Sequence, residues 1–204
     1  MAGRPSSENS TAGKATVITE TELKKILRFI STGKHPERNK ALMMVSHFLG
    51  LRAKEMAALK IADVYEDEQL KPVIRLYGAY TKNAKHRDAQ LSNPKLMEAL
   101  TEYIEFRKGQ SCPRFEINAP LFISQKRTPF SPNSMVQLLK NIYVDAGYPD
   151  ASSHSGRRSL ITKLASKSID INIIRQVAGH ASIATTQIYI DDNPARVADV
   201  LADL

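Results

Sequence analysis

The sequence is poor in the features that mark several protein classes. Its single cysteine, Cys112, excludes an internal disulfide and offers no spacing for a cysteine-ligated metal site. No apolar run approaches the roughly 20 residues that a membrane-spanning helix needs. The N-terminal stretch MAGRPSSENSTAGK has no apolar segment of the kind found in a secretory signal. We therefore expect a cytoplasmic protein with no membrane partner.

Positive charge is present in excess. The 204 residues include 29 lysines and arginines against 21 aspartates and glutamates, for a formal net charge of +8. Such an excess suits a polyanionic partner, because each cation that meets a phosphate releases condensed counterions. Many basic proteins bind no nucleic acid, so charge alone leaves both DNA binding and a basic domain unrelated to DNA open.

Hydrophobic periodicity and capping signals predict a mainly α fold with one small antiparallel β-sheet. Residues 1–17 have little to bury and are predicted to be a flexible tail or linker, and residues 193–204 a C-terminal helix. The predicted strands are 72–77, 89–91 and 121–124, with a turn over 78–88. The predicted helices between the two termini are 19–33, 36–50, 54–59, 93–107, 132–146, 155–167, 171–178 and 182–190.

The first chemical motif begins at Gly50. Glycine allows a sharp turn, which places Arg52 at a helix start, and Glu55 three residues later lies on the same helix face. The carboxylate of Glu55 can then hold the guanidinium of Arg52. Taken alone, the pair is more typical of a solvent-exposed ion pair on a helix.

Two further motifs supply cations. Lys82 lies in the predicted hairpin connection, from which a lysine can reach into a cleft, although such lysines are often simply solvated. His154 and Arg157 share one face at a helix start, where both can address one anion. The alternative for this pair is a capped helix with exposed cations.

The fourth motif is Gly179-His180, followed nine residues later by Tyr189. The chain has seven tyrosines, and periodicity does not distinguish Tyr189 from a tyrosine that merely packs against the core.

In this order, the four motifs resemble the tyrosine recombinase (phage integrase) family over nearly all of residues 17–192. The resemblance implies the catalytic-domain fold of the DNA breaking-rejoining enzymes over residues 18–192. It also implies a catalytic set, supported by Glu55, that consists of Arg52, Lys82, His154, Arg157, His180 and Tyr189.

The resemblance implies DNA cleavage and rejoining through a 3′-phosphotyrosyl bond to Tyr189, without ATP, metal or another cofactor. The two arginines would bind the phosphoryl oxygens, which suits their planar charged forks. His154 would take or relay the proton of the tyrosine, and Lys82 would protonate the departing 5′ oxygen. His180 would hydrogen-bond the phosphate or support Tyr189.

The implied partner is double-stranded DNA, bound by a homotetramer, with an accessory DNA-bending protein or a second recombinase as further partners. The protein would be bacterial or phage-encoded and nucleoid-associated. Residues 193–204 would dock into a neighbouring subunit or fold back on their own domain. The candidates for DNA backbone contacts, each of which could instead be simply solvated, are Lys54, Lys60, Lys85 and Arg87.

The sequence departs from the family at two points. Gly156 stands where the family usually has an apolar residue, so we expect looser packing at this helix start. Arg158 follows Arg157 directly, so either arginine could be the one that corresponds to the second arginine of the family, although the three-residue step from His154 favours Arg157. The chain also lacks the N-terminal domain of most relatives, as a fragment would or as small stand-alone members such as fimbrial phase-variation invertases do.

Two other functions remain open at the level of sequence. A type IB topoisomerase uses a similar set of side chains, and a DNA-binding regulator can retain the fold without turnover. Integration, excision, inversion and resolution would share one active site, and the target DNA sequence cannot be deduced.

Overall fold

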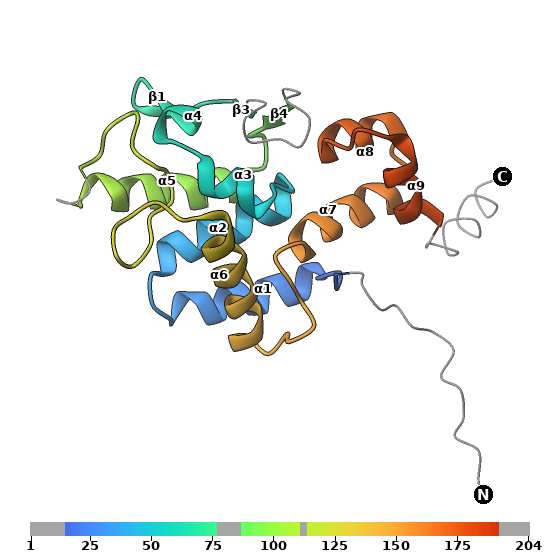
Figure 1. Cartoon of the computed structure of the whole chain (residues 1–204), viewed down its shortest axis with the longest axis horizontal. Coiled ribbons are helices and arrows are strands. Elements are labelled where there is room, and N and C mark those ends of the chain that lie inside the picture. The colour runs from blue at the N-terminus through green and yellow to red at the C-terminus, as the bar shows by residue number, and fades with distance from the viewer. Residues whose placement is uncertain (1–14, 77–86, 111–113, 192–204) are drawn as a thin grey trace, which may run out of the picture.

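The structure, a computed structural model, describes residues 15–76, 87–110 and 114–191 and is mainly helical, which confirms the predicted fold class (Figure 1). The elements are α1 Glu20–Ser31, α2 Pro36–Phe48, α3 Ala53–Ala58, α4 Ile61–Val64, β1 Tyr65–Glu66, β2 Gln69–Leu70, β3 Val73–Leu76, β4 Arg87–Gln90, α5 Pro94–Lys108, α6 Pro132–Asp145, α7 Ser155–Ser166, α8 Ile171–Ala178 and α9 Ile183–Asp191. Within the described residues, no helix is long and apolar enough to cross a membrane.

Local capping explains where several helices begin. The Thr19 hydroxyl accepts a hydrogen bond from the Glu22 amide, and the Glu22 carboxylate accepts one from the Thr19 amide at 2.7 Å, the capping box predicted for α1. Asn93 caps α5 ahead of Pro94, and Asp170 caps α8. These helix starts depend on a few adjacent residues, which is why the sequence predicts them closely.

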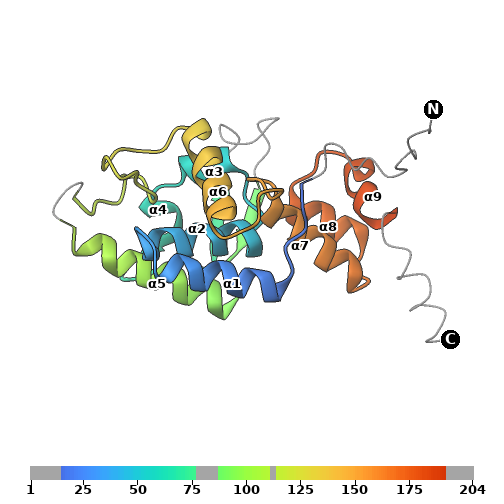
Figure 2. The same cartoon turned by 90° about the horizontal axis from the view of Figure 1, so that it is seen from below.

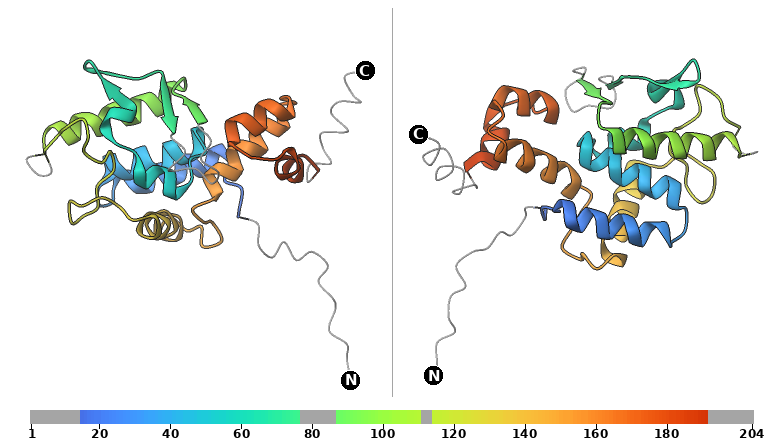
Figure 3. Two further views of the ribbon diagram at one scale, coloured as in Figure 1. Left: turned by 45° about the horizontal axis from the view of Figure 1, so that its top comes forward. Right: turned by 180° about the vertical axis from the view of Figure 1, so that it is seen from behind.

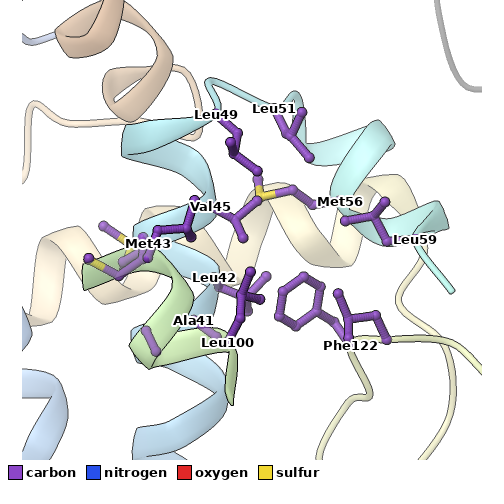
Figure 4. Packing of buried hydrophobic residues seen from close by; sticks show 14 of the residues in the cluster. Ala41, Leu42, Met43, Val45, Leu49, Leu51, Met56, Leu59, Leu100 and Phe122 are labelled. Atoms are coloured by element: carbon purple, nitrogen blue, oxygen red, sulfur yellow. The ribbon is translucent and has the colours of Figure 1, made fainter. Parts of the chain in front are cut away.

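The main hydrophobic core surrounds α2. This helix contacts α1, α5 and α7, so its side chains are buried on nearly every face. Figure 4 shows Leu42, Met43 and Val45 of α2 with Leu100 of α5 and Phe122, all at most 1% exposed. The core gives α2 and α3 a rigid base, and the first chemical motif lies between these two helices.

A second, smaller core holds the C-terminal helices. Ile161 and Ala165 of α7 pack with Ile174 and Ala178 of α8, and Tyr189 of α9 lies against them. We call α8, α9 and this second half of α7 the C-terminal unit (residues 161–191). Figure 2 and Figure 3 show α8 and α9 at one end of the molecule, with α7 leading to them from the main body.

The strands differ from those predicted. Two separate hairpins, β1–β2 and β3–β4, take the place of one sheet, and β4 begins at Arg87, inside the predicted turn. The turn of β1–β2 has positive φ at Asp67 and Glu68, 49° and 59°, without the glycine that usually marks such turns.

The predicted strand 121–124 is wrong. The structure has only isolated bridges there, Ile123 with Pro129 and Lys60 with Pro120. Proline has no N–H to donate to a ladder, so neither bridge extends into a strand.

The start of α7 packs closely against α2, so the expectation of loose packing at Gly156 is wrong. A Cβ atom at Gly156 would lie 2.3 Å from Ser46 Oγ and 2.9 Å from the Ser46 carbonyl carbon. Glycine is therefore required because two helix backbones approach each other here. The close approach brings the His154–Arg157 motif next to the end of α2.

Two terminal predictions have different outcomes. Residues 15–17, assigned to the tail, lie along the domain, where Ala15 O accepts a hydrogen bond from Arg158 Nη1 at 2.8 Å. The predicted C-terminal helix 193–204 lies outside the described residues.

Candidate active site

The candidate site lies where the N-terminal ends of α3 and α7 meet the C-terminal end of α8. Gly50, with a φ of 57°, turns the chain between α2 and α3. A Cβ atom on Gly50 would lie 3.1 Å from Leu160 Cδ2 and 3.5 Å from Arg157 Cγ. The turn places Arg52 at the N-terminus of α3 and leaves room for Arg157 beside it.

Glu55 is a buried carboxylate shared by two arginines. It is fully buried and accepts hydrogen bonds from the Arg52 amide and from Arg52 Nη1, both at 2.8 Å. Its Oε2 atom also accepts a hydrogen bond from Arg87 Nη2 at 2.9 Å. The predicted Arg52–Glu55 pair is therefore present, and Glu55 orients the Arg52 guanidinium from inside the protein instead of forming a surface pair with it.

Arg52, Arg87 and Arg157, here called the arginine cluster, cap the C-terminal end of α8. The Gly179 amide and the His180 amide already donate to Gln176 O and Arg175 O. The next three carbonyls carry the partial negative charge of the helix end. Their donors are Arg87 Nη1 to Val177 O at 2.6 Å, Arg157 Nη2 to Ala178 O, and Arg52 Nη2 to Gly179 O at 3.4 Å.

Arg157 is the arginine that α7 directs into the site. It is 6% exposed and also donates to Gly50 O at 2.7 Å. Burial, followed by the charges of Arg52 and Arg87, lowers the pKa of Arg157 to about 9, so the guanidinium is still charged at neutral pH. Arg158 instead bonds to Ala15 O, so the three-residue step from His154 leads to Arg157, as predicted.

His180 and Tyr189 form a pair beside the arginine cluster. The two rings stack with centroids 6.0 Å apart and planes at 19°. His180 is 8% exposed, and its Nδ1 lies 3.0 Å from Thr186 Oγ1. Burial, then the charges of the arginine cluster, lowers the pKa of His180 to about 4, so the ring is neutral at pH 7. Thr186, which is fully buried, orients this ring.

His154 lies at the N-terminus of α7 and is exposed. Its Nδ1 atom lies 3.3 Å from Ser153 Oγ. Although the residue is exposed, part of its ring is shielded from water, and this partial desolvation lowers the pKa of His154. The positive charges of Arg157 and Arg52 lower this pKa further. A neutral imidazole at the edge of a cationic site is suited to accept a proton.

The site carries more positive than negative charge. The three guanidinium groups of the arginine cluster lie near a single carboxylate, which pairs with Arg52 and Arg87, and two of the three, on Arg87 and Arg157, are buried. The Arg52 side chain is 32% exposed and keeps donors open to solvent. An arrangement of this kind has the charge and the N–H donors that suit an anion such as a phosphate. In the part of the chain that the structure describes, no three His, Cys, Asp or Glu side chains are grouped to hold a metal ion.

The remaining predicted cations are placed differently. Lys82 and Lys85 lie outside the described residues, whereas Lys54 and Lys60 are exposed. Arg87 is only 8% exposed and points into the protein, so the expectation of an exposed residue free to contact DNA is wrong. In β4, Arg87 and Ala89 are buried, whereas the two residues that alternate with them are exposed. This alternation could have indicated a buried Arg87, but residues 78–88 were predicted to form a turn.

Known proteins share both the sequence and the fold. The chain matches the phage integrase family over residues 16–196. It is 31% identical over 179 residues to the tyrosine recombinase XerD of Neisseria meningitidis, covering 85% of this chain and 57% of that protein. It is also 31% identical over 175 residues to the tyrosine recombinase XerA of Pyrococcus furiosus, covering 84% of this chain and 56% of that protein. The chain thus spans little more than half the length of these relatives.

Two solved structures show the same architecture. The crystal structure of XerA recombinase superposes with a TM-score of 0.73 at 26% identity, over 92% of this chain and 65% of that one. The XerH recombinase bound to palindromic difH substrate, a post-cleavage complex, superposes with a TM-score of 0.70 at 26% identity, over 95% of this chain and 55% of that one. Because the family model matches residues 16–196, most of the chain, the chain belongs to the phage integrase family.

Proposed function

We propose that the protein is a site-specific DNA recombinase that cuts and rejoins DNA by transesterification at Tyr189. The observation that carries the proposal is the arginine cluster on a buried carboxylate, next to the stacked pair of His180 and Tyr189. An anion site beside a partly buried tyrosine is what an attack on a phosphodiester requires.

In the proposed cleavage step, Tyr189 Oη bonds to phosphorus and the bond from phosphorus to the 5′ oxygen breaks. The tyrosine proton passes to His154, and Lys82 protonates the departing 5′ oxygen. Arg52 and Arg157 bind the two non-bridging oxygens, whose charge is stabilised most strongly in the transition state. Each guanidinium has five N–H donors, so bonds to the α8 carbonyls leave donors for phosphate.

Religation reverses the step. The 5′ hydroxyl of a DNA end attacks the phosphotyrosyl bond and releases Tyr189. One phosphodiester is exchanged for another, so the reaction is nearly balanced in free energy and the proposed step uses neither ATP nor a metal ion. The assembly of several subunits on DNA then has to determine whether cleavage or religation is favoured.

The proposed partner is double-stranded DNA. The net charge of +8 and the XerH structures solved with difH substrate support it. Lys54 and Lys60 are exposed cations that we assign to backbone contacts. We further propose that four copies assemble on DNA within the cytoplasm, with helix 193–204 docking into a neighbouring copy and with accessory proteins or a second recombinase where the DNA site requires them.

Covalent trapping tests the proposal. The protein is mixed with fragmented DNA of its source, quenched with SDS, and assayed for DNA that is released only by protease. We expect the wild-type protein to form this product and Tyr189→Phe to form none, because no other group replaces the phenolic oxygen. Sequencing of the attached DNA then identifies the target site.

Tyr148→Phe is the matched control, since Tyr148 is also partly buried but lies outside the site. It should retain the product. If Tyr189→Phe retains the product as well, Tyr189 is not the nucleophile. If the wild-type protein shifts DNA on a gel but forms no covalent product, either cleavage requires a partner or the protein is a DNA-binding regulator.

A further inference from the structure

We propose that Arg87 is a positioning residue that fixes the C-terminal unit, with His180 and Tyr189, against the half of the site that carries Arg52. This inference rests on the proposed function and adds a residue to the machinery of the same reaction. It depends on the contacts of Arg87, on the space left for it by Gly179, and on the separation of the two hydrophobic cores.

Arg87 makes one buried and one partly buried hydrogen bond to two different parts of the chain. Its Nη2 atom donates to Glu55 Oε2 at 2.9 Å, and its Nη1 atom donates to Val177 O at 2.6 Å. Glu55 also holds Arg52, so one carboxylate sets the positions of both guanidinium groups. A lysine has a single ammonium centre and cannot reproduce this planar, two-sided geometry.

The backbone at Gly179 lies so close to the Arg87 side chain that no side chain fits there. Its φ is 61°, a left-handed conformation that favours glycine. A Cβ atom there would also lie 2.3 Å from Arg87 Cδ and 2.9 Å from Arg87 Nε. The residue immediately before His180 therefore lacks a side chain at the point where Arg87 passes beneath the end of α8.

The contacts matter because the two sides of the site have separate hydrophobic cores. Residues around α2 and α3 form the main core, whereas Tyr189 packs with the core of the C-terminal unit. Between the sides, the arginine cluster bonds to the last carbonyls of α8. In the proposed reaction Arg52 and Arg157 engage the phosphate, which leaves Arg87 as the member of the cluster that holds α8 and Glu55 without contacting phosphate.

Arg87 is also close in sequence to the proposed general acid, since it lies five positions after Lys82. Through Glu55 and Val177, Arg87 links the part of the chain that carries Arg52 to the part that carries His180 and Tyr189. Its loss should slow the chemical step much more than it weakens DNA binding.

The experiment compares Arg87→Met and Arg87→Lys with the wild-type protein and with Arg75→Met. Arg75 lies on the same hairpin but is 64% exposed and pairs with Asp88 at 3.4 Å, so it serves as the control. The DNA is the fragment recovered by covalent trapping. Gel shifts give the Kd, and single-turnover formation of the covalent product at saturating protein gives the rate of cleavage.

We expect Arg87→Met to lower the cleavage rate by about 100-fold, the effect of misplacing reacting groups by about 1 Å. Its Kd should stay within about threefold, because Arg87 is buried and touches no phosphate. Arg87→Lys should fall between Arg87→Met and the wild type, and Arg75→Met should cleave like the wild type. Equal losses in Kd and rate, or no loss in rate, would overturn the inference.

A second measurement needs neither DNA nor activity. Hydrogen–deuterium exchange of the free Arg87→Met protein should accelerate in residues 171–191 and stay unchanged in α1 and α2. Acceleration throughout the chain would assign Arg87 a general structural role instead, and no change in 171–191 would also contradict the inference. If the wild-type protein forms no covalent product, the proposed function fails, and this measurement still decides whether Arg87 positions the C-terminal unit.

Discussion

At the scale of single residues, the protein holds its charges by burying them with specific partners. Glu55 is fully buried but accepts hydrogen bonds from Arg52 and Arg87. Removing one partner of such a buried pair typically costs about 3–5 kcal/mol, because the remaining charge is left without compensation. The arginine cluster is therefore a structural element as well as a candidate phosphate site.

His47 predicts a dependence of stability on pH. It is 6% exposed, its Nδ1 lies 2.9 Å from Met43 O, and burial lowers its pKa to about 4. The unfolded chain binds a proton near pH 6.5 and the folded protein only near pH 4. The free energy of unfolding should therefore be highest above pH 6.5 and fall as the pH decreases toward 4, with His47 contributing on the order of 3 kcal/mol.

Urea unfolding of the wild-type protein and of His47→Gln between pH 7 and pH 4 measures this contribution. The glutamine variant should lose less stability on acidification, since it has no proton to bind. His35→Asn is the control, because His35 is exposed and its left-handed backbone tolerates asparagine. Parallel pH profiles for His47→Gln and the wild-type protein would contradict the prediction.

At the scale of elements, the contact between α2 and α7 positions the second motif. Gly156 lies against Ser46, so the backbones of the two helices meet without an intervening side chain. The His154–Arg157 pair is therefore carried by a helix start that the main core holds directly.

Gly156→Ala should destabilise the protein by about 1–3 kcal/mol, the usual cost of inserting a methyl group into a packed contact. Gly109→Ala is the matched control, because Gly109 ends α5 with a φ of −71° and a Cβ atom there makes only ordinary contacts. Thermal unfolding of both variants compares them. Equal Tm values for Gly156→Ala and the wild-type protein would show that α7 moves away from α2 at no cost.

At the scale of the whole molecule, two hydrophobic cores give two regions of different stability. The main core includes most buried residues, whereas the C-terminal unit relies on a few apolar side chains and on the arginine cluster. A small core has little apolar area to bury, so the unit that carries Tyr189 should open without unfolding of the main body. Such opening is compatible with a nucleophile that has to meet DNA.

Truncating one buried side chain in each core tests whether the two regions differ in stability. Ile174 and Leu42 are both fully buried, in the C-terminal unit and in the main core respectively. Ile174→Ala should accelerate hydrogen exchange in residues 171–191 while exchange in α2 and α5 stays as in the wild type. Leu42→Ala should lower the stability of the main body by about 2–5 kcal/mol. Uniform acceleration in Ile174→Ala would indicate one cooperative unit.

The sequence by itself determined most of the helices, though not the short α4, and the set of candidate residues. Helix ends at Thr19, Asn93 and Gly179 depend on neighbours within a few positions, so their signals are local. The order of the four motifs was likewise sufficient to identify the family.

Only the tertiary structure decided how these residues act together. Arg87 bonds to a carbonyl 90 positions away, Arg157 to one 107 positions away and Arg52 to one 127 positions away. The burial of Arg87 and the close approach at Gly156 depend equally on distant segments. No local pattern encodes such contacts, because they exist only after the main core and the C-terminal unit have packed on either side of the site.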